Sequence, residues 1–356
     1  MNGLNLSEAS DIRLGSNTIN AIYYGPTLLW PSKRDYSKEY LTIEAVSDAT
    51  VLFNKNNDNI SRTIQYSKDK NTWNTISFVH PSGDITESSP VSLLAGEKLY
   101  LKGNNSSYGT PDGSFCRINI HEGFGNIYGN IMSLIYGDNF YGQTVLDTSF
   151  SFMHLFYAIY HNNIIDASNL ILPATTLSKS CYYHMFNGCT SLTSAPELPA
   201  TTLASHCYGY MFANCEQLTV APELPATTLA SCCYPGMFSG CISLTTAPEL
   251  PAKTLPQGSD SEGCYSHMFN GCISLTTAPE LPATVLTGFA YWGMFSNCES
   301  LSYIKCLAID IDAIWCTRKW LDGVSSTGTF VKNTNMQNWP TGTDGIPSGW
   351  TVQDAS

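Results

Sequence analysis

Two pairs of residues have the spacing of zinc ligands, Cys181-x-x-His184 and Cys264-x-x-His267. Both pairs occupy the same place in a repeating unit of the chain, and they lie three units apart. At about 5 Å between stacked units, one ion would have to take ligands from side chains about 15 Å apart. We therefore expect no metal ion and no cofactor in this protein.

Motifs for catalysis are missing from the sequence. There is no G-x-S-x-G turn around a serine nucleophile, no H-E-x-x-H helix and no glycine-rich loop that could hold a phosphate. The seven histidines are scattered, and no pair of carboxylates stands out for glycoside hydrolysis. We expect a protein that is not an enzyme.

One tyrosine recurs in every unit, next to a cysteine in the first four, and forms a column of aromatic rings. Such a column can pack half-buried in the protein, with each hydroxyl group bonded to a neighbour. It can also lie on the surface and stack on sugar rings or on a protein partner. The candidate binding residues are therefore Tyr182, Tyr208, Tyr234, Tyr265 and Tyr291.

A glutamate also recurs in four units, just before a Leu-Pro pair. Like charges about 5 Å apart repel one another, so we expect these carboxylates to be solvated. A calcium bridge is the alternative, although the unit supplies no second carboxylate to complete such a site. The column consists of Glu197, Glu223, Glu249 and Glu280.

These columns exist because the second half of the chain repeats itself every 26 residues. Each unit has an extended run ending in Leu-Pro, a small-residue segment, and a Cys-Tyr-x-x-Met-Phe stretch that can make one or two helical turns. A unit this small cannot bury its apolar side alone, so neighbouring units must stack. The five repeats are residues 173–198, 199–224, 225–250, 251–281 and 282–307, and the fourth carries five extra residues near positions 257–263.

Stacking predicts a core of identical residues in register. We expect three apolar columns: Leu177, Leu203, Leu229, Leu255 and Leu286; Phe186, Phe212, Phe238, Phe269 and Phe295; and Leu192, Leu218, Leu244, Leu275 and Leu301. Nine of the thirteen cysteines also fall in register, and such ladders behave as small buried hydrophobes with free thiols. The two ladders are Cys181, Cys207, Cys233 and Cys264, and Cys189, Cys215, Cys241, Cys272 and Cys298. Of the other four, Cys232, Cys116 and Cys316 fit neither ladder, and Cys306 lies where the pattern of the fifth repeat decays.

The repeated pattern L-x-x-A-x-x-L-P … L … M-F-x-x-C-x-x-L resembles the BspA-like (Treponema-type) leucine-rich repeats, which use an A-F-x-x-C turn and an L-P at the strand end. The resemblance covers residues 173–307 well and 151–172 weakly. The chain departs from the family in its longer period, in Met-Phe for Ala-Phe, and in the extra proline of each strand. The resemblance implies a mainly β, leucine-rich-repeat-like solenoid that offers a binding surface.

Both ends of the repeats should be closed by atypical segments. Residues 126–172 are expected to form an N-terminal cap and a degenerate repeat, in which Leu155-Phe156 replaces Met-Phe. Residues 308–356, with four tryptophans, are expected to form the C-terminal cap.

The first third of the chain reads as a β-sandwich-like domain over residues 36–125. Alternating apolar residues predict strands in 40–53, and 63–76 and 91–101 read as β-hairpins, the latter turning at 95–97. Residues 1–35 are too short for a core of their own and resemble N-terminal modules of virion and tail proteins of phages that infect gut bacteria. We expect this segment to attach the protein through Ile22, Tyr23, Tyr24, Leu29 and Trp30.

Charge and hydropathy exclude several kinds of partner. The net charge is −12 and no cluster of basic residues occurs, so we expect no binding to nucleic acid. The sequence shows neither a secretory signal nor an apolar run of about 20 residues. We therefore expect that the protein does not insert into a membrane and that it assembles in the host cytoplasm.

Together these features predict a phage virion fibre or decoration protein, present as a homo-oligomer, whose repeats display a surface that binds a host protein or glycan. The alternatives are a bacterial cell-surface adhesin and a carbohydrate-binding module.

Overall fold

The computed structural model describes residues 35–56, 62–82, 85–158, 161–259 and 261–355. It also describes the backbone of four short strands near the N-terminus, which pair as two antiparallel ribbons: β1 (Arg13–Leu14) with β2 (Asn17–Thr18), and β3 (Ile22–Tyr24) with β4 (Thr27–Trp30). The side chains of the expected attachment residues Ile22, Tyr23, Tyr24, Leu29 and Trp30 lie outside the described residues. The chain is mainly β, as expected, and its described part contains no helix long and apolar enough to cross a membrane.

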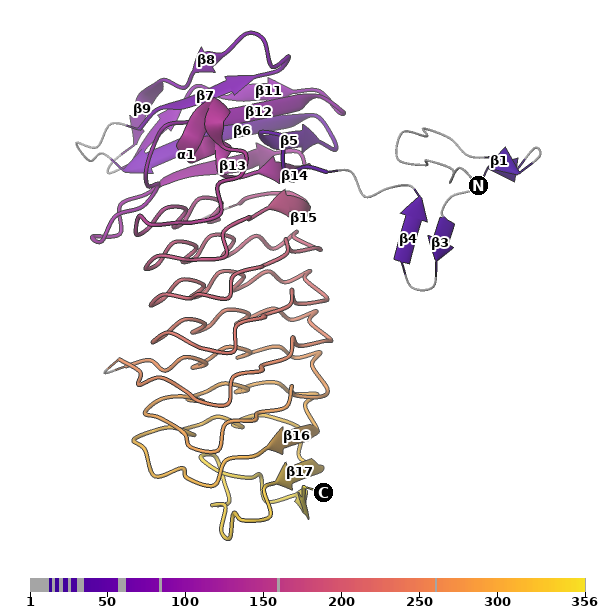
Figure 1. Ribbon diagram of the computed structural model, residues 1–356, viewed down its shortest axis with the longest axis vertical. Coiled ribbons are helices and arrows are strands. Elements are labelled where there is room, and N and C mark those ends of the chain that lie inside the picture. Colours follow the sequence, from indigo (N-terminus) through magenta and orange to yellow (C-terminus); the bar gives the residue numbers. More distant parts are fainter. Residues whose placement is uncertain are drawn as a thin grey trace.

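Two sheets form the unit at one end of the molecule (Figure 1). One has the order β15 (Ile164–Ile171), β14 (Gly125–Asn130), β5 (Leu41–Ala45), β12 (Lys98–Gly103), β7 (Ile64–Ser67) and β8 (Asn74–Thr75). The other has the order β11 (Val91–Leu93), β6 (Ala49–Asn56), β10 (Ile85–Ser88) and β9 (Phe78–Ser82), and β13 (Cys116–Glu122) also pairs with β6. The predicted alternation in 40–53 is confirmed, because Leu41, Ile43, Val51 and Phe53 are all buried in one core.

One of the two predicted hairpins is confirmed and the other is wrong. Strands β7 and β8 pair antiparallel, with Tyr66 opposite Asn74. Strands β11 and β12 do not pair with each other, because β11 pairs with β6 in one sheet and β12 pairs with β5 and β7 in the other. The turn at 95–97 therefore carries the chain from one sheet to the other, and both strands still bury alternate side chains in the shared core.

The N-terminal unit and the repeats share a sheet. Strand β14 pairs antiparallel with β5 and parallel with β15, which belongs to the first coil of the repeats. The boundary expected between residues 125 and 126 therefore falls within β14. A short helix α1 (Ser133–Tyr136) and a 3-10 turn η1 (Gly137–Asn139) follow this strand.

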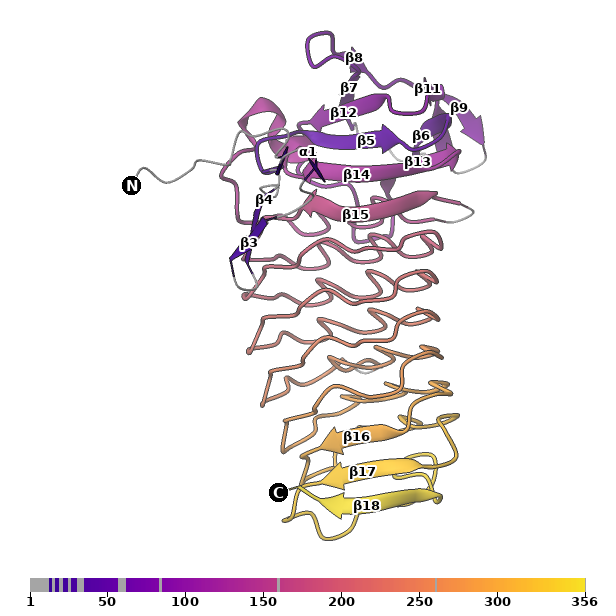
Figure 2. The same ribbon diagram turned by 90° about the vertical axis from the view of Figure 1, so that its right-hand side faces the viewer.

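Successive repeats lie on one another as a stack of coils (Figures 1 and 2). The prediction of helical turns in the Cys-Tyr-x-x-Met-Phe stretch is wrong for the described repeats. About every second backbone N–H group in this stretch donates to a carbonyl of the next coil instead of to its own coil. The N–H of Tyr182 donates to the carbonyl of Cys207 at 3.0 Å, whereas that of Tyr183 donates to Ser180 in its own coil at 3.3 Å. Every fourth residue, such as His184, adopts a positive φ that makes this alternation possible.

The apolar columns are buried where the sequence placed them. The Phe and second Leu columns are fully buried, whereas Leu203, Leu229 and Leu255 in the first Leu column are only partly buried. Neighbouring Phe rings stack at centroid distances of 5.3 to 5.8 Å, and the column begins at Phe156, which confirms the alignment of the degenerate repeat.

The cysteine ladders point inward, as predicted, and all thirteen cysteines are buried and take part in no disulfide. In the second ladder each thiol donates to the carbonyl of the ladder phenylalanine in the preceding coil, for example Cys241 to Phe212 at 3.1 Å. The inward direction of every thiol in a ladder explains why neighbouring cysteines do not pair.

The C-terminal segment begins with one more coil. The N–H of Phe295 donates to the carbonyl of Trp320 at 2.9 Å, in the pattern of the earlier repeats. Strands β16 (Tyr303–Cys306), β17 (Gly328–Lys332) and β18 (Trp350–Asp354) then pair in parallel at the end of the stack, on the face that carries β15 (Figure 2).

Candidate functional site

The tyrosine column proposed from sequence is not a binding surface. Tyr182, Tyr208, Tyr234, Tyr265 and Tyr291 are each at most 2% exposed, and their rings stack on one another inside the coils. The rings therefore pack in the interior, as the packing alternative expects, but they are fully rather than half buried, and the buried hydroxyl of Tyr182 has no hydrogen-bond partner among the described residues. The reason is the turn geometry, which directs side chains in pairs, so that Cys-Tyr and Met-Phe point inward and the two residues between them point outward.

The outward pairs carry a different set of aromatic side chains, which are partly exposed. We call this set, together with the exposed Trp315, the aromatic face: Tyr183, His184, Tyr210, His267, Trp292 and Trp315. His184 and Tyr210 stack with centroids 4.9 Å apart and planes 6° apart. Trp292 lies 4.7 Å from His267 and 6.4 Å from Trp315. The rings thus form two groups, one over the first two repeats and one from the fourth repeat to Trp315, and the third repeat between them carries Pro235 and Gly236 at the outward positions.

Glycines in neighbouring coils make room for these rings. A Cβ atom at Gly236, where φ is +56°, would lie 2.2 Å from the ring of Tyr210. A Cβ atom at Gly209 would lie 2.8 Å from the ring of Tyr183. Both rings therefore lie flat against backbone, which limits their motion and fixes the shape of the aromatic face.

A polar cluster of His206, Cys232 and Glu262 lies beside the aromatic face. The first two precede the ladder cysteine of the second and third repeats, and Glu262 belongs to the insertion in the fourth. One ligand-type atom from each residue lies within 4.8 Å of the other two. The Nε2 atom of His206 is 3.6 Å from Oε2 of Glu262, and the Tyr210 hydroxyl donates to Oε1 of Glu262 at 2.7 Å.

The surroundings favour a thiolate at Cys232 and a protonated ring at His206. Burial acts to raise the pKa of Cys232, but hydrogen bonds from His206 and from neighbouring serines outweigh it and lower the pKa to about 7. Hydrogen bonds to Cys232 and Glu262 raise the pKa of His206 to about 9, against the effect of burial. Burial also acts to raise the pKa of Glu262, and hydrogen bonds from His206 and Tyr210 reverse this effect and lower it.

The cluster could not be recognised from residue spacing along the chain. Its members lie 26 and 30 residues apart, and Glu262 enters the cluster only because of the insertion. The Cys-x-x-His pairs examined from sequence do not assemble, because Cys181 and Cys264 face the core and His184 and His267 face outward. The available signal was that Cys232 fits neither ladder and lies next to an irregular repeat.

The glutamate column lies on another part of each coil. All four side chains are exposed, which agrees with the solvated interpretation, and Glu280 pairs with Lys305 at 2.9 Å. Two equivalent pockets of about 460 and 440 Å³ lie between neighbouring coils beside the glutamate column. Their walls are mainly proline and alanine, with a glutamate at the rim, for example Pro196, Pro222 and Glu223.

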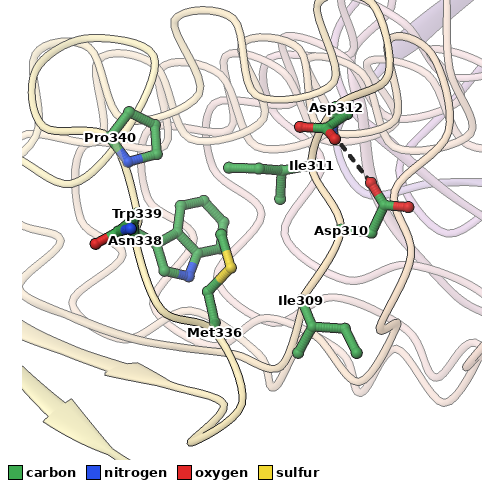
Figure 3. A pocket seen from close by; sticks show the side chains of 8 residues that line it. All are labelled: Ile309, Asp310, Ile311, Asp312, Met336, Asn338, Trp339 and Pro340. Atoms are coloured by element: carbon green, nitrogen blue, oxygen red, sulfur yellow. Dashed lines mark hydrogen bonds between the residues drawn. The ribbon is translucent and has the colours of Figure 1, made fainter.

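A further cavity of about 580 Å³ lies near the C-terminal end (Figure 3). Trp339, Met336 and Pro340 line one side and the segment from Ile309 to Asp312 lines the other. The backbone N–H of Asp312 donates to the carboxylate of Asp310 at 3.1 Å. The cavity therefore combines apolar walls with acidic groups, but these residues occur once and not in every repeat.

A scan against models of known protein families, a search of curated proteins and a search of solved structures found no match to this chain. Its function is therefore inferred from the geometry of its own residues.

Proposed function

We propose that this chain is a non-enzymatic binding protein in which a β-sandwich-like domain carries a capped, leucine-rich-repeat-like solenoid. The aromatic face of the solenoid binds a glycan on the surface of a host cell, and the protein is a fibre or decoration protein of a phage particle. The similarity of the repeats to BspA-like sequences supports the solenoid, as does the stacking of coils in register.

The aromatic face is the observation that carries the proposal. Partly exposed rings lie over the coils on both sides of the third repeat, so an extended ligand with several units could contact both groups of rings. Sugars suit such a surface, because their apolar faces pack on aromatic rings and their hydroxyl groups bond to polar side chains. The carboxylate of Glu262 and the hydroxyl of Tyr210 supply such polar groups beside the rings.

The free thiols support folding in a reducing compartment. Thirteen buried cysteines without a disulfide are unusual in a secreted protein and ordinary in a cytosolic one. A phage structural protein folds in the host cytoplasm before it joins the particle. This property favours the virion over a secreted adhesin.

Replacing Trp292 by alanine is expected to weaken glycan binding about tenfold, which corresponds to about 1.4 kcal/mol. The ring is partly exposed and no side-chain hydrogen bond holds it to the described residues, so its removal should change the surface more than the core. Binding would be measured by titration with a glycan selected on an array. Tyr303→Ala is the matched control, because this ring is 38% exposed but belongs to β16 outside the aromatic face. Equal loss in both variants, or none for Trp292→Ala, would refute the role of the aromatic face.

The attachment role of residues 1–35 has a separate test. This segment carries many apolar residues for its length, which would promote aggregation if they stayed uncovered on a monomer. A chain beginning at Asp35 should remain folded and soluble but no longer join the particle, as measured by co-sedimentation with assembled particles. Aggregation or unfolding of the shortened chain would show instead that the segment completes the core of the N-terminal unit.

A further inference from the structure

The polar cluster beside the aromatic face has the composition of a metal site. It offers an imidazole, a thiol and a carboxylate, from three coils that are adjacent in the stack. The residue before the ladder cysteine is Ser180 in the first repeat and Gly263 in the fourth, and in the fifth repeat Phe289 precedes Ala290, which stands at the cysteine position. Ligand-type side chains therefore meet where the insertion interrupts the repeat.

We propose that Nε2 of His206, Sγ of Cys232 and Oε2 of Glu262 bind one Zn²⁺ ion, with a fourth position open to solvent. This site goes beyond the proposed glycan binding and does not depend on it. His206 and Glu262 are 28% and 22% exposed, whereas Cys232 is buried. An ion would therefore enter past the imidazole and the carboxylate and reach the thiolate last.

In two of the three ligand residues, the side-chain atom that would not bind the metal already contacts a neighbouring side chain. Ser205 Oγ lies 2.7 Å from Nδ1 of His206, and the Tyr210 hydroxyl donates to Oε1 of Glu262. These contacts leave Nε2 and Oε2 directed toward each other, 3.6 Å apart. Metal-binding histidines and carboxylates in proteins are commonly oriented by such second contacts.

The distances suit a small tetrahedral ion. Bonds of about 2.0 to 2.3 Å place the ligand atoms of tetrahedral zinc about 3.3 to 3.8 Å apart. The separation of Nε2 and Oε2 falls in that range, and the upper limit of 4.8 Å for the cluster requires a side-chain adjustment of about 1 Å. The cluster is therefore close to a binding geometry without any movement of the backbone.

The mixture of donor atoms selects the ion. Calcium and magnesium take oxygen ligands and would not use a thiolate, and Cu⁺ favours sulfur over a carboxylate. Zinc accepts nitrogen, sulfur and oxygen together, and sites with three protein ligands keep an open position for water or another ligand. A metal binds the neutral imidazole and the thiolate, so binding at this site would release the proton that His206 and Cys232 hold, and the bound thiolate and carboxylate would balance the charge of the ion.

The inserted loop is built to hold Glu262 in place. The N–H of Ser259 donates to the carbonyl of Glu262 at 2.8 Å, and the N–H of Glu262 donates to the Ser259 hydroxyl at 3.1 Å. The Cys232 thiol lies 3.2 Å from the same Glu262 carbonyl. Zinc at this point would connect the second, third and fourth repeats and should stabilise the middle of the stack.

Cobalt titration of the metal-free full-length protein tests the proposal. Co²⁺ should bind once per chain with a thiolate-to-cobalt charge-transfer band and visible bands of a four-coordinate ion, and Zn²⁺ should displace it. Cys232→Ser should abolish the charge-transfer band and weaken binding at least 100-fold. Glu262→Gln should weaken binding at least tenfold, and because this side chain lies on a surface loop, the variant should fold normally. His121→Gln, which changes an exposed histidine of β13 outside both the cluster and the aromatic face, should bind as the wild type does.

Three results would overturn the proposal: no charge-transfer band in the wild type, an unchanged band in Cys232→Ser, or equal affinity in Glu262→Gln and the wild type. Circular dichroism of each metal-free variant separates lost ligands from lost structure. If Cys232→Ser does not fold, the comparison of Glu262→Gln with His121→Gln still decides the question. Glycan binding is absent from the assay, so its outcome does not depend on the proposed function.

Discussion

Truncation of Phe238 to alanine is expected to lower the free energy of unfolding by about 3–5 kcal/mol. The ring is fully buried in the middle of the stack, between Phe212 at 5.8 Å and Phe269 at 5.7 Å. Its loss leaves a cavity in the coil that contains residue 238. The two neighbouring coils cannot move in to fill this cavity, because backbone hydrogen bonds to that coil fix their positions. Chemical denaturation monitored by circular dichroism would measure the change.

The control for this experiment is Glu223→Gln in the neighbouring repeat. The carboxylate is exposed and belongs to a column of like charges, so its neutralisation should leave stability unchanged or raise it slightly. A Phe238→Ala variant as stable as Glu223→Gln would show that the Phe column does not hold the coils together. Because each coil contacts only its neighbours, the destabilisation should spread in both directions along the stack.

The core of the repeats could be predicted because its residues are identical in every unit. A position that recurs as Phe or Leu through five repeats must face the part of the structure that also recurs, which is the interior. The same logic aligned Leu155-Phe156 with Met-Phe, and the stacking of Phe156 on Phe186 at 5.3 Å confirms it.

Whether the tyrosine side chains point into the core or toward solvent could not be predicted in the same way. A helical turn spreads its side chains around an axis, whereas this backbone directs them in alternating pairs, inward and outward. That pattern arises because N–H groups bond alternately to their own coil and to the next. Once it is known, the sequence is informative: the recurring pair Cys181-Tyr182 must be inside, and the variable pair Tyr183-His184 must be outside.

Contacts between residues far apart along the chain could not be predicted from the sequence either. The turn at 95–97 looks the same in a hairpin and in a crossing between sheets, because Val91, Leu93, Leu99 and Leu101 alternate identically in both. Likewise, the distance between Cys232 and Glu262 along the chain says nothing of their proximity until the path of the inserted loop is known. Both features depend on partners that lie elsewhere in the chain.

Truncation of Trp320 to alanine should also cost about 3–5 kcal/mol, but the damage should appear at one end of the molecule. The ring is fully buried, stacks on Tyr291 at 6.1 Å and on Trp339 at 5.4 Å, and donates its Nε1–H to the carbonyl of Gly345 at 2.9 Å. It thus joins the last tyrosine of the column to the C-terminal segment. Its removal leaves a cavity and an unpaired buried carbonyl, which adds to the loss.

Hydrogen exchange would show where the structure opens. In Trp320→Ala, backbone amides of β17, β18 and the last coil should exchange faster, while those of the N-terminal sheets keep their protection, because a stack loses order first where a cap is weakened. Trp320→Phe is the control: it keeps most of the stacking area and loses the hydrogen bond, so it should fall between the alanine variant and the wild type. Uniformly faster exchange along the whole chain in Trp320→Ala would mean that the coils unfold as one unit. The proposal that Trp320 stabilises the contact between the last coil and the C-terminal segment would then be wrong.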